Sequence, residues 1–330
     1  MREMTEIEKN IFSIKSESDF QRLALEIFRF QYEQNPVYQS FIRKLGINIT
    51  SVQNYLEIPF LPIEFFKTHQ VACGNFKPEA VFLSSGTTGI NTSRHFIKSL
   101  PFYEKSLLRG FRSFFGKPEK YVILALLPSY LERSGSSLVH MASLLIRRSK
   151  HKSSGFYLHD YERLAVELSK LKKQGQKVIL LGVTYALLDL AEQFPLKFPE
   201  LILMETGGMK GKRREMVREE LHDVLSSAFG VKNIYSEYGM TELLSQAYSK
   251  GRGVFSTPPW MRILIRDVND PLSLLPEGKS GGINVMDLAN IYSCSFIATQ
   301  DLGKLDSSRD FEVLGRFDNS DVRGCNLLVG

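Results

Sequence analysis

The sequence contains few cysteines and no long apolar run. Its 330 residues include three cysteines, Cys73, Cys294 and Cys325, too few for the disulfide framework of a small secreted domain. No stretch approaches the roughly 20 apolar residues that cross a bilayer. The first residues, Met1 to Glu6, contain no apolar signal segment. We therefore expect a cytoplasmic protein without a membrane span.

Common nucleotide and nucleic-acid signatures are also missing. Neither the Gly-x-x-x-x-Gly-Lys-Ser/Thr loop nor the Gly-x-Gly-x-x-Gly turn occurs. Lys and Arg number 42 against 36 Asp and Glu, a net charge of +6, and only 147–152 and 210–214 are densely basic. We interpret both runs as solvated surface, and the mildly basic balance favours anionic ligands such as nucleotides. No basic stripe with interleaved aromatic residues is present, so no nucleic-acid partner is expected.

The spacing of apolar residues predicts an α/β fold. Residues 1–45 are expected to be helical, since Phe20, Leu23, Ile27 and Phe30 recur at helical spacing. Further along, continuous apolar runs predict buried strands, and helical patterns follow them at about 184–191 and 212–229. These predicted strands are 121–127, 177–183 and 201–204. Strands that alternate with helices indicate a mainly parallel sheet flanked by helices.

After about Val254 the helical periodicity fades. Short strand-like pieces at 262–266, 282–285 and 295–298 are separated by turns, which indicates a smaller β-rich subdomain. We therefore divide the chain into a helical segment, an α/β core and a β-rich subdomain. Their predicted bounds are 1–58, 59–253 and 254–330.

The first informative motif follows a short strand predicted at Ala80–Leu83. It consists of Ser84, Ser85, Gly86, Thr87, Thr88 and Gly89. The glycines allow positive φ and close backbone approach, and the hydroxyls and N–H groups can surround phosphate oxygens. Hydroxyl-rich glycine turns also occur in plain hairpins, so the motif alone leaves both interpretations open.

The second motif runs from Tyr235 to Glu242. The Tyr238 ring can stack on a base, Gly239 forms a turn, Thr241 can hydrogen-bond a phosphate, and the Glu242 carboxylate suits Mg²⁺. Thr299 to Gly303 and Gly315 to Asp318 complete an ordered set of four. That order resembles the acyl-adenylate-forming superfamily, over roughly residues 60–330.

The resemblance implies residue roles. The Ser84–Gly89 loop and Tyr238–Glu242 would hold ATP and Mg²⁺, and Asp301 would bind the ribose hydroxyls. Gly207 and Gly208 would border the acyl and adenine pocket, and Arg316 would lie at the junction to a small C-terminal domain and contact the nucleotide. The family loop continues with a lysine, and here the basic residue is Arg94.

The tail favours one branch of the superfamily. The sequence ends fourteen residues after Arg316, so we expect the small C-terminal domain and its adenylation lysine to be missing. This end, with Cys325 near it, is similar to the acyl-protein synthetases of the bacterial luminescence fatty-acid reductase complex. The resemblance implies that Cys325 carries an acyl group to a partner, a reductase or carrier protein, and Arg323 would lower its pKa.

Other interpretations stay open beside this one. The chain could be a stand-alone acyl-CoA or acyl-carrier-protein ligase, or a nucleotide-binding module without turnover. Four phenylalanines could line an acyl tunnel or form ordinary core: Phe102, Phe111, Phe114 and Phe115. We expect Cys73 and Cys294 to be inert, and His222 to pair on a helix surface with Glu219 rather than bind a metal.

Overall fold

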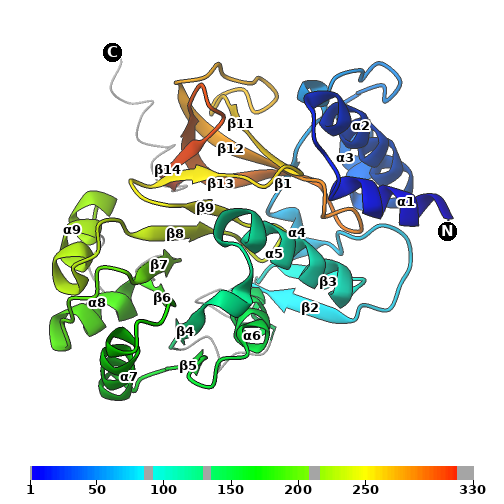
Figure 1. The fold of residues 1–330 in the computed structure, drawn as a ribbon. Coiled ribbons are helices and arrows are strands. Elements are labelled where there is room, and N and C mark those ends of the chain that lie inside the picture. Colours follow the sequence, from blue (N-terminus) through cyan, green and yellow to red (C-terminus); the bar gives the residue numbers. More distant parts are fainter. Residues whose placement is uncertain (1, 85–91, 129–134, 208–215, 318–330) are drawn as a thin grey trace, which may run out of the picture. The chain divides into compact units, whose positions relative to one another are not determined.

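The computed structural model describes residues 2–84, 92–128, 135–207 and 216–317. They form two compact units, which are described separately (Figure 1). The first unit comprises the described residues of 1–75 and 259–330, and the second comprises those of 76–258. The three-part division expected from the sequence stays a prediction.

The second unit is built around a sheet with the strand order β10-β9-β8-β7-β6-β4-β5. The five strands from β8 to β5 run parallel, whereas β9 and β10 are antiparallel. Their bounds are Val122–Leu126 (β4), Gly155–Phe156 (β5), Val178–Val183 (β6), Ile202–Thr206 (β7), Tyr235–Tyr238 (β8), Ala247–Ser249 (β9) and Val254–Ser256 (β10). A separate antiparallel pair joins Ala80–Leu83 (β2) to Arg94–Ile97 (β3).

Helices cover both faces of the parallel strands. Two of them, α5 and α6, lie on one side, and α7, α8 and α9 lie on the other (Figure 1). Their bounds are Leu100–Phe115 (α5), Ser137–Ser149 (α6), Tyr161–Lys173 (α7), Thr184–Gln193 (α8) and Arg218–Phe229 (α9), with a 3₁₀ turn at Pro118–Lys120. Every residue of β4 and β6 is buried, as expected for parallel strands covered on both faces.

The first unit combines N-terminal helices with an antiparallel sheet. The strand order is β11-β12-β13-β14, and β1 adds to β13 in parallel. The strands are Leu61–Pro62 (β1), Met261–Arg266 (β11), Ser280–Asp287 (β12), Phe296–Leu305 (β13) and Phe311–Arg316 (β14). The helices are Arg2–Ile11 (α1), Glu17–Gln34 (α2), Pro36–Lys44 (α3) and Phe65–Thr68 (α4), with a 3₁₀ turn at Tyr55–Glu57.

Local sequence explains where these N-terminal helices start and stop. Ser16 and Asp19 form a capping box at the start of α2. Asn35 ends α2 and caps α3 through its side chain, and Pro36 takes the first position of α3. Asn35 and Pro36 therefore form the junction between two helices.

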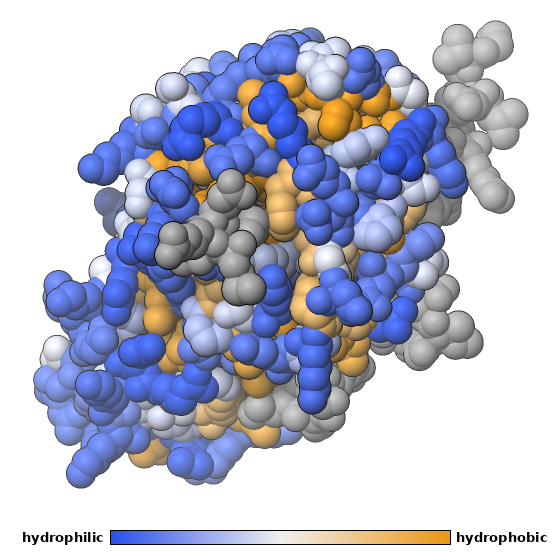
Figure 2. All heavy atoms as spheres, turned by 90° about the vertical axis from the view of Figure 1, so that its right-hand side faces the viewer, coloured by the Kyte–Doolittle hydropathy of each residue, from blue (hydrophilic) through white to orange (hydrophobic). Residues whose placement is uncertain are grey.

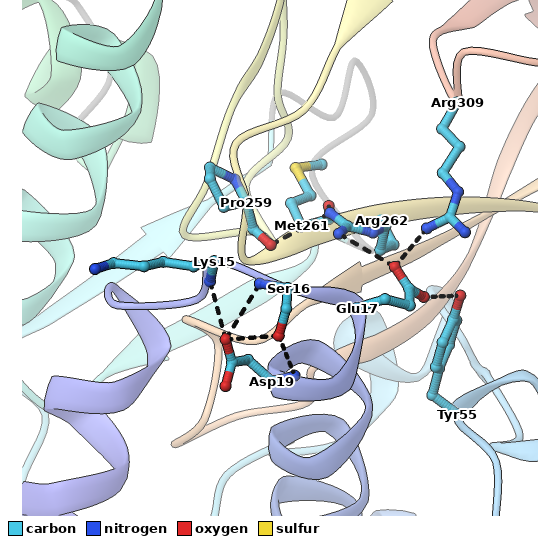
Figure 3. A network of polar contacts seen from close by, with 9 residues as sticks. All are labelled: Lys15, Ser16, Glu17, Asp19, Tyr55, Pro259, Met261, Arg262 and Arg309. Carbon is cyan, nitrogen blue, oxygen red and sulfur yellow. Dashed lines mark hydrogen bonds and ion pairs between the residues drawn. The ribbon is translucent and has the colours of Figure 1, made fainter.

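A polar network ties the N-terminal helices to the antiparallel sheet (Figure 3). Tyr55 donates a hydrogen bond of 2.7 Å to Glu17, and Arg309 donates one of 2.6 Å to the same carboxylate. Arg262 on β11 lies 3.8 Å from Glu17. Burial acts to raise the pKa of Glu17, but these hydrogen bonds and charges outweigh it and lower the pKa. The network explains how residues far apart in sequence form one unit.

The structure confirms the predicted α/β class, with a mainly parallel sheet and a smaller β-rich part. The face shown in Figure 2 is covered mainly by hydrophilic side chains, with smaller apolar areas between them. Within the described residues, no helix has the length and apolar character needed to cross a membrane.

Candidate active site

The Tyr238–Glu242 turn begins where β8 ends. The Tyr238 ring is largely buried and meets the Phe255 ring edge to face, with centroids 6.0 Å apart. Glu242 is 5 % exposed. Carboxyl ends of parallel strands are the usual ligand edge of an α/β sheet, so the turn lies where a bound nucleotide is expected.

The first motif lies in the connection between β2 and β3. Ser84 is the first residue of the predicted phosphate loop. The Ser84 hydroxyl accepts a hydrogen bond of 2.9 Å from the Ser93 N–H. The Ser84 N–H in turn donates to the Ser93 carbonyl at 3.1 Å. Ser85 to Gly89 lie outside the described residues, so the choice between a phosphate loop and a plain hairpin stays open there. Arg94 follows the connection with an exposed side chain on β3.

A histidine joins this hairpin to the Tyr238–Glu242 turn. His95 on β3 is 1 % exposed, and its Nδ1 lies 2.7 Å from the carbonyl oxygen of Thr241. The two residues are 146 positions apart in sequence. The structure therefore brings together two motifs that sequence spacing could not connect.

The ends of β6 and β7 also converge. Gly207 has a φ of 67°, in the left-handed region that glycine adopts without strain. Its carbonyl accepts a hydrogen bond of 2.8 Å from the hydroxyl of Thr184, the first residue of α8. Gly208 lies outside the described residues, and the role of this glycine pair at the acyl and adenine pocket stays a prediction.

Two carboxyl groups that carried no predicted role lie beneath the turn. Glu237 on β8 accepts a hydrogen bond of 2.5 Å from the Thr206 hydroxyl. Glu205 on β7 accepts one of 3.3 Å from Thr184. A Cβ added to Gly239 would lie 2.4 Å from Glu237 Oε1, so a larger residue here would displace this carboxyl group.

Strand register places Glu237 on the α5 and α6 face of the sheet. Glu237 is the direct partner of Thr206 on β7 and of Tyr248 on β9, and such partners share a face. Tyr248 lines a small apolar cavity beside Phe111 of α5 and Met141 of α6. The carboxyl group thus lies between the strand ends and the apolar layer under these helices.

The surroundings of Glu237 raise its pKa to about 7. Burial is the largest cause and the neighbouring Glu205 charge adds to it, while the Thr206 hydrogen bond opposes it. Burial also raises the pKa of Glu205, against the opposing effects of the nearby Ser236 and Thr184 hydroxyl groups and the charge of Arg218. Near neutral pH, this pair retains a proton that exposed carboxyl groups would have lost.

Replacing Glu237 with glutamine should increase stability above pH 7. The native state holds this proton to higher pH than the unfolded chain, so stability falls as pH rises from about 4.5 to about 7. Glutamine removes that loss, which amounts to about 3 kcal/mol at most. Urea unfolding at pH 5 and pH 8 measures the difference, with the exposed Glu220→Gln as control. Equal pH dependence in Glu237→Gln and wild type would contradict the assignment.

The first unit holds the other two predicted nucleotide residues. Asp301 on β13 is paired in register with Arg316 on β14. The Arg316 Nε lies 3.3 Å from Asp301 Oδ1, with side chains 72 % and 15 % exposed respectively. The Asp301 N–H donates to the Thr299 hydroxyl at 3.1 Å. An ion pair so exposed on one side is weak and would yield readily to a ligand.

The two described cysteines are buried in the first unit. Cys73 donates its S–H to the Ser293 carbonyl at 3.2 Å, and Cys294 to the Phe296 carbonyl at 3.3 Å. Burial raises the pKa of Cys294 to about 12, which disfavours the reactive thiolate. Cys325 and Arg323 lie outside the described residues.

The α5 phenylalanines serve largely as core. Phe111 and Phe115 are buried, with ring centroids 5.0 Å apart, and Phe115 meets Tyr248 edge to face at 5.2 Å. A small apolar cavity lies beside Phe111, so the question whether these rings also line an acyl tunnel stays open. An open surface groove between α7 and residues 194–196 contains none of the motif residues, so we do not place the site there.

Three polar residues were missed from the sequence: His95, Glu205 and Glu237. Glu237 lies inside the second motif, and Glu205 stands two residues before Gly207. The only available signal was a charged residue at the end of an apolar strand. His222 was expected to pair with Glu219, but its Nε2 is buried and makes no hydrogen bond within the described residues. Burial, with Arg218 nearby, lowers its pKa to about 4.

Comparison with known families identifies the family of the chain. The sequence model of the family described as acyl-protein synthetase, LuxE, matches residues 144–330, more than half of the chain. The chain belongs to this family. The resemblance inferred from the four motifs is thereby confirmed. No curated protein matches the sequence.

Solved structures with a similar fold are acyl-activating ligases. The 2-hydroxyisobutyryl-CoA ligase, solved with 2-HIB-AMP and CoA, has a TM-score of 0.68 and 14% identity, over 93% of this chain and 77% of that one. ATP-bound MatB from Rhodopseudomonas palustris has a TM-score of 0.54 and 19% identity, over 72% of this chain and 48% of MatB. The acyl-protein synthetase spans about half of MatB. At these identities the likeness establishes the fold.

The turn offers one carboxylate, that of the buried Glu242, as the predicted magnesium ligand. No cluster of three or more His, Cys, Asp or Glu side chains suited to a metal occurs among the residues that the structure describes. If Glu242 binds the ion, phosphate oxygens and waters would supply the other ligands. That division is the usual one for Mg²⁺ in nucleotide sites.

Proposed function

We propose that this protein activates a fatty or other carboxylic acid with ATP and transfers the acyl group to Cys325. The acyl group then passes to a partner protein. The observation that carries the proposal is the junction of the β2–β3 hairpin with the Tyr238–Glu242 turn through His95. Two elements suited to phosphate and metal thus adjoin at the ligand edge of the sheet.

In the first step the protein positions reactants rather than transferring protons. A carboxylic acid is already ionised at neutral pH, so its oxygen can attack the α-phosphorus of ATP. A carboxyl–phosphorus bond forms, the bond to the bridging oxygen breaks, and pyrophosphate leaves. Thr241, Arg94 and the Ser84–Gly89 segment would hold phosphate oxygens, and Glu242 would hold Mg²⁺, which neutralises developing charge. Asp301 would orient the ribose, with Arg316 beside it.

In the second step a thiolate takes the acyl group. The Cys325 sulfur attacks the acyl carbon, a carbon–sulfur bond forms, and the bond to AMP breaks. Cys73 and Cys294 are buried, so their thiols are not accessible to an acyl-adenylate. This burial supports Cys325 as the carrier. Transfer of the thioester to a reductase or carrier protein would complete turnover.

Intact mass after incubation with ATP, Mg²⁺ and a panel of carboxylic acids tests this proposal. We expect one acyl adduct per chain, removed by hydroxylamine. Acylation of added CoA without a protein adduct would favour the stand-alone ligase instead. Absence of both products with every acid would leave a nucleotide-binding module without turnover.

Removal of the Asp301 carboxylate should weaken ATP binding. Asp301→Ala is expected to cost about 1.5–3 kcal/mol, the contribution of charge-assisted hydrogen bonds to ribose. Asp301→Asn keeps the shape and one acceptor, so it should recover part of that loss. Isothermal titration with ATP measures the effect. Unchanged affinity in Asp301→Ala would show that the ribose lies elsewhere.

A further inference from the structure

His95 occupies a fixed position in the interior of the second unit. On β3 it pairs in register with Phe82 of β2, and the two side chains share the inward face of the hairpin. Phe82 packs in turn on Tyr103 of α5, with ring centroids 5.1 Å apart. The imidazole is almost fully buried and hydrogen-bonded to the Thr241 carbonyl, so the close-packed interior leaves it little room to rotate.

The hydrogen-bond partner determines the tautomer. A carbonyl oxygen can only accept a hydrogen bond, so the Thr241 contact requires the proton on His95 Nδ1. The accepting oxygen belongs to the peptide group that joins Thr241 to Glu242. A fixed carbonyl direction restrains ψ of Thr241 and φ of Glu242, the two backbone angles on either side of that peptide group. The histidine therefore restrains the backbone between the two predicted ligand residues.

We infer that His95 is a positioning residue that sets the Thr241–Glu242 peptide for binding of the metal–nucleotide pair. The inference rests on the proposed function, because it assigns His95 to that same site. The Ser84–Ser93 hydrogen bonds close the hairpin that leads into β3. His95 thus links this hairpin to the Tyr238–Glu242 turn through one hydrogen bond.

Two substitutions separate this role from general packing. Asparagine places its amide nitrogen as many bonds from Cα as His95 Nδ1, whereas glutamine places it one bond further. His95→Asn should therefore retain pyrophosphate exchange within about threefold. His95→Gln should lower it by about a hundredfold, the effect of a displacement of about 1 Å at a reacting centre, and raise the Mg²⁺ concentration for half-maximal exchange about tenfold. The KM for the carboxylic acid should stay unchanged in both.

A second measurement does not depend on turnover. Nitrogen NMR of histidine-labelled protein, with His95→Asn used for assignment, should show the proton on Nδ1. A proton on Nε2, or equal losses in the two variants, would overturn the inference. A wild-type chain without exchange for any acid would refute the proposed function instead. The affinities of the two variants for MgATP would then decide the inference, and equal affinities would overturn it.

Discussion

Replacing Cys325 with serine should abolish the hydroxylamine-sensitive acylation of the protein and leave pyrophosphate exchange largely intact. Adenylation precedes the thiol step, so loss of the thiol stops only the transfer. A serine hydroxyl is a far weaker nucleophile at neutral pH than a thiol, of which a few per cent is ionised at its ordinary pKa of about 8.5. Radiolabelled acid and intact mass measure the adduct, and exchange of labelled pyrophosphate measures the first step.

The chain supplies matched controls for this experiment. Cys73→Ser and Cys294→Ser should keep the acyl adduct, because both thiols are buried and hydrogen-bonded to carbonyls. Persistence of the label in Cys325→Ser, mapped to either buried cysteine, would contradict the carrier assignment. Loss of exchange together with the label would show that residue 325 also serves the adenylation step.

Glu242→Gln should lower the adenylation rate by about a hundredfold to a thousandfold. Glutamine keeps the shape and removes the charge that would hold Mg²⁺, and the metal acts on charge that develops at phosphate in the transition state. The affinity for the carboxylic acid should change less than twofold. Rapid-quench measurement of acyl-adenylate formation gives the rate, and protection against proteolysis by the acid gives the affinity.

The exposed Glu219→Gln serves as a control for removal of one negative charge from the second unit. It should leave both the rate and the acid affinity unchanged. Equal losses of rate and acid affinity in Glu242→Gln would indicate that this buried carboxylate supports the fold of the turn instead. Restoration of the rate by excess Mg²⁺ would agree with weakened metal binding.

Several of the sheet strands could be predicted from local pattern. β4 and β6 are continuous apolar runs because both faces of a parallel strand are covered. The ends of elements were less predictable. The α9 helix begins at Arg218 after extended Val217, whereas the apolar pattern placed its start near 212. On α2, Phe28 is fully buried and Phe30 only partly, since the contacts of that helix, not its spacing, decide which ring faces the core.

The candidate site was likewise predictable only in part from the sequence. Tyr238 to Glu242 and Asp301 were found because they form short motifs, which local sequence can carry. His95 and Glu237 were missed because their roles come from partners distant in the sequence. The His95–Thr241 contact joins residues 146 positions apart, and the Glu237 pKa depends on burial and on Glu205. No pattern within a short window encodes either relation.

The central claim, that this protein activates carboxylic acids as adenylates, is tested most directly by ATP–pyrophosphate exchange in the wild-type chain. The reaction contains ATP, Mg²⁺ and labelled pyrophosphate, with and without a series of carboxylic acids. The account predicts that label enters ATP only when an acid is present, because pyrophosphate leaves only when a carboxylate attacks the α-phosphorus. Exchange independent of the acid, or none with any acid in the series, would contradict it.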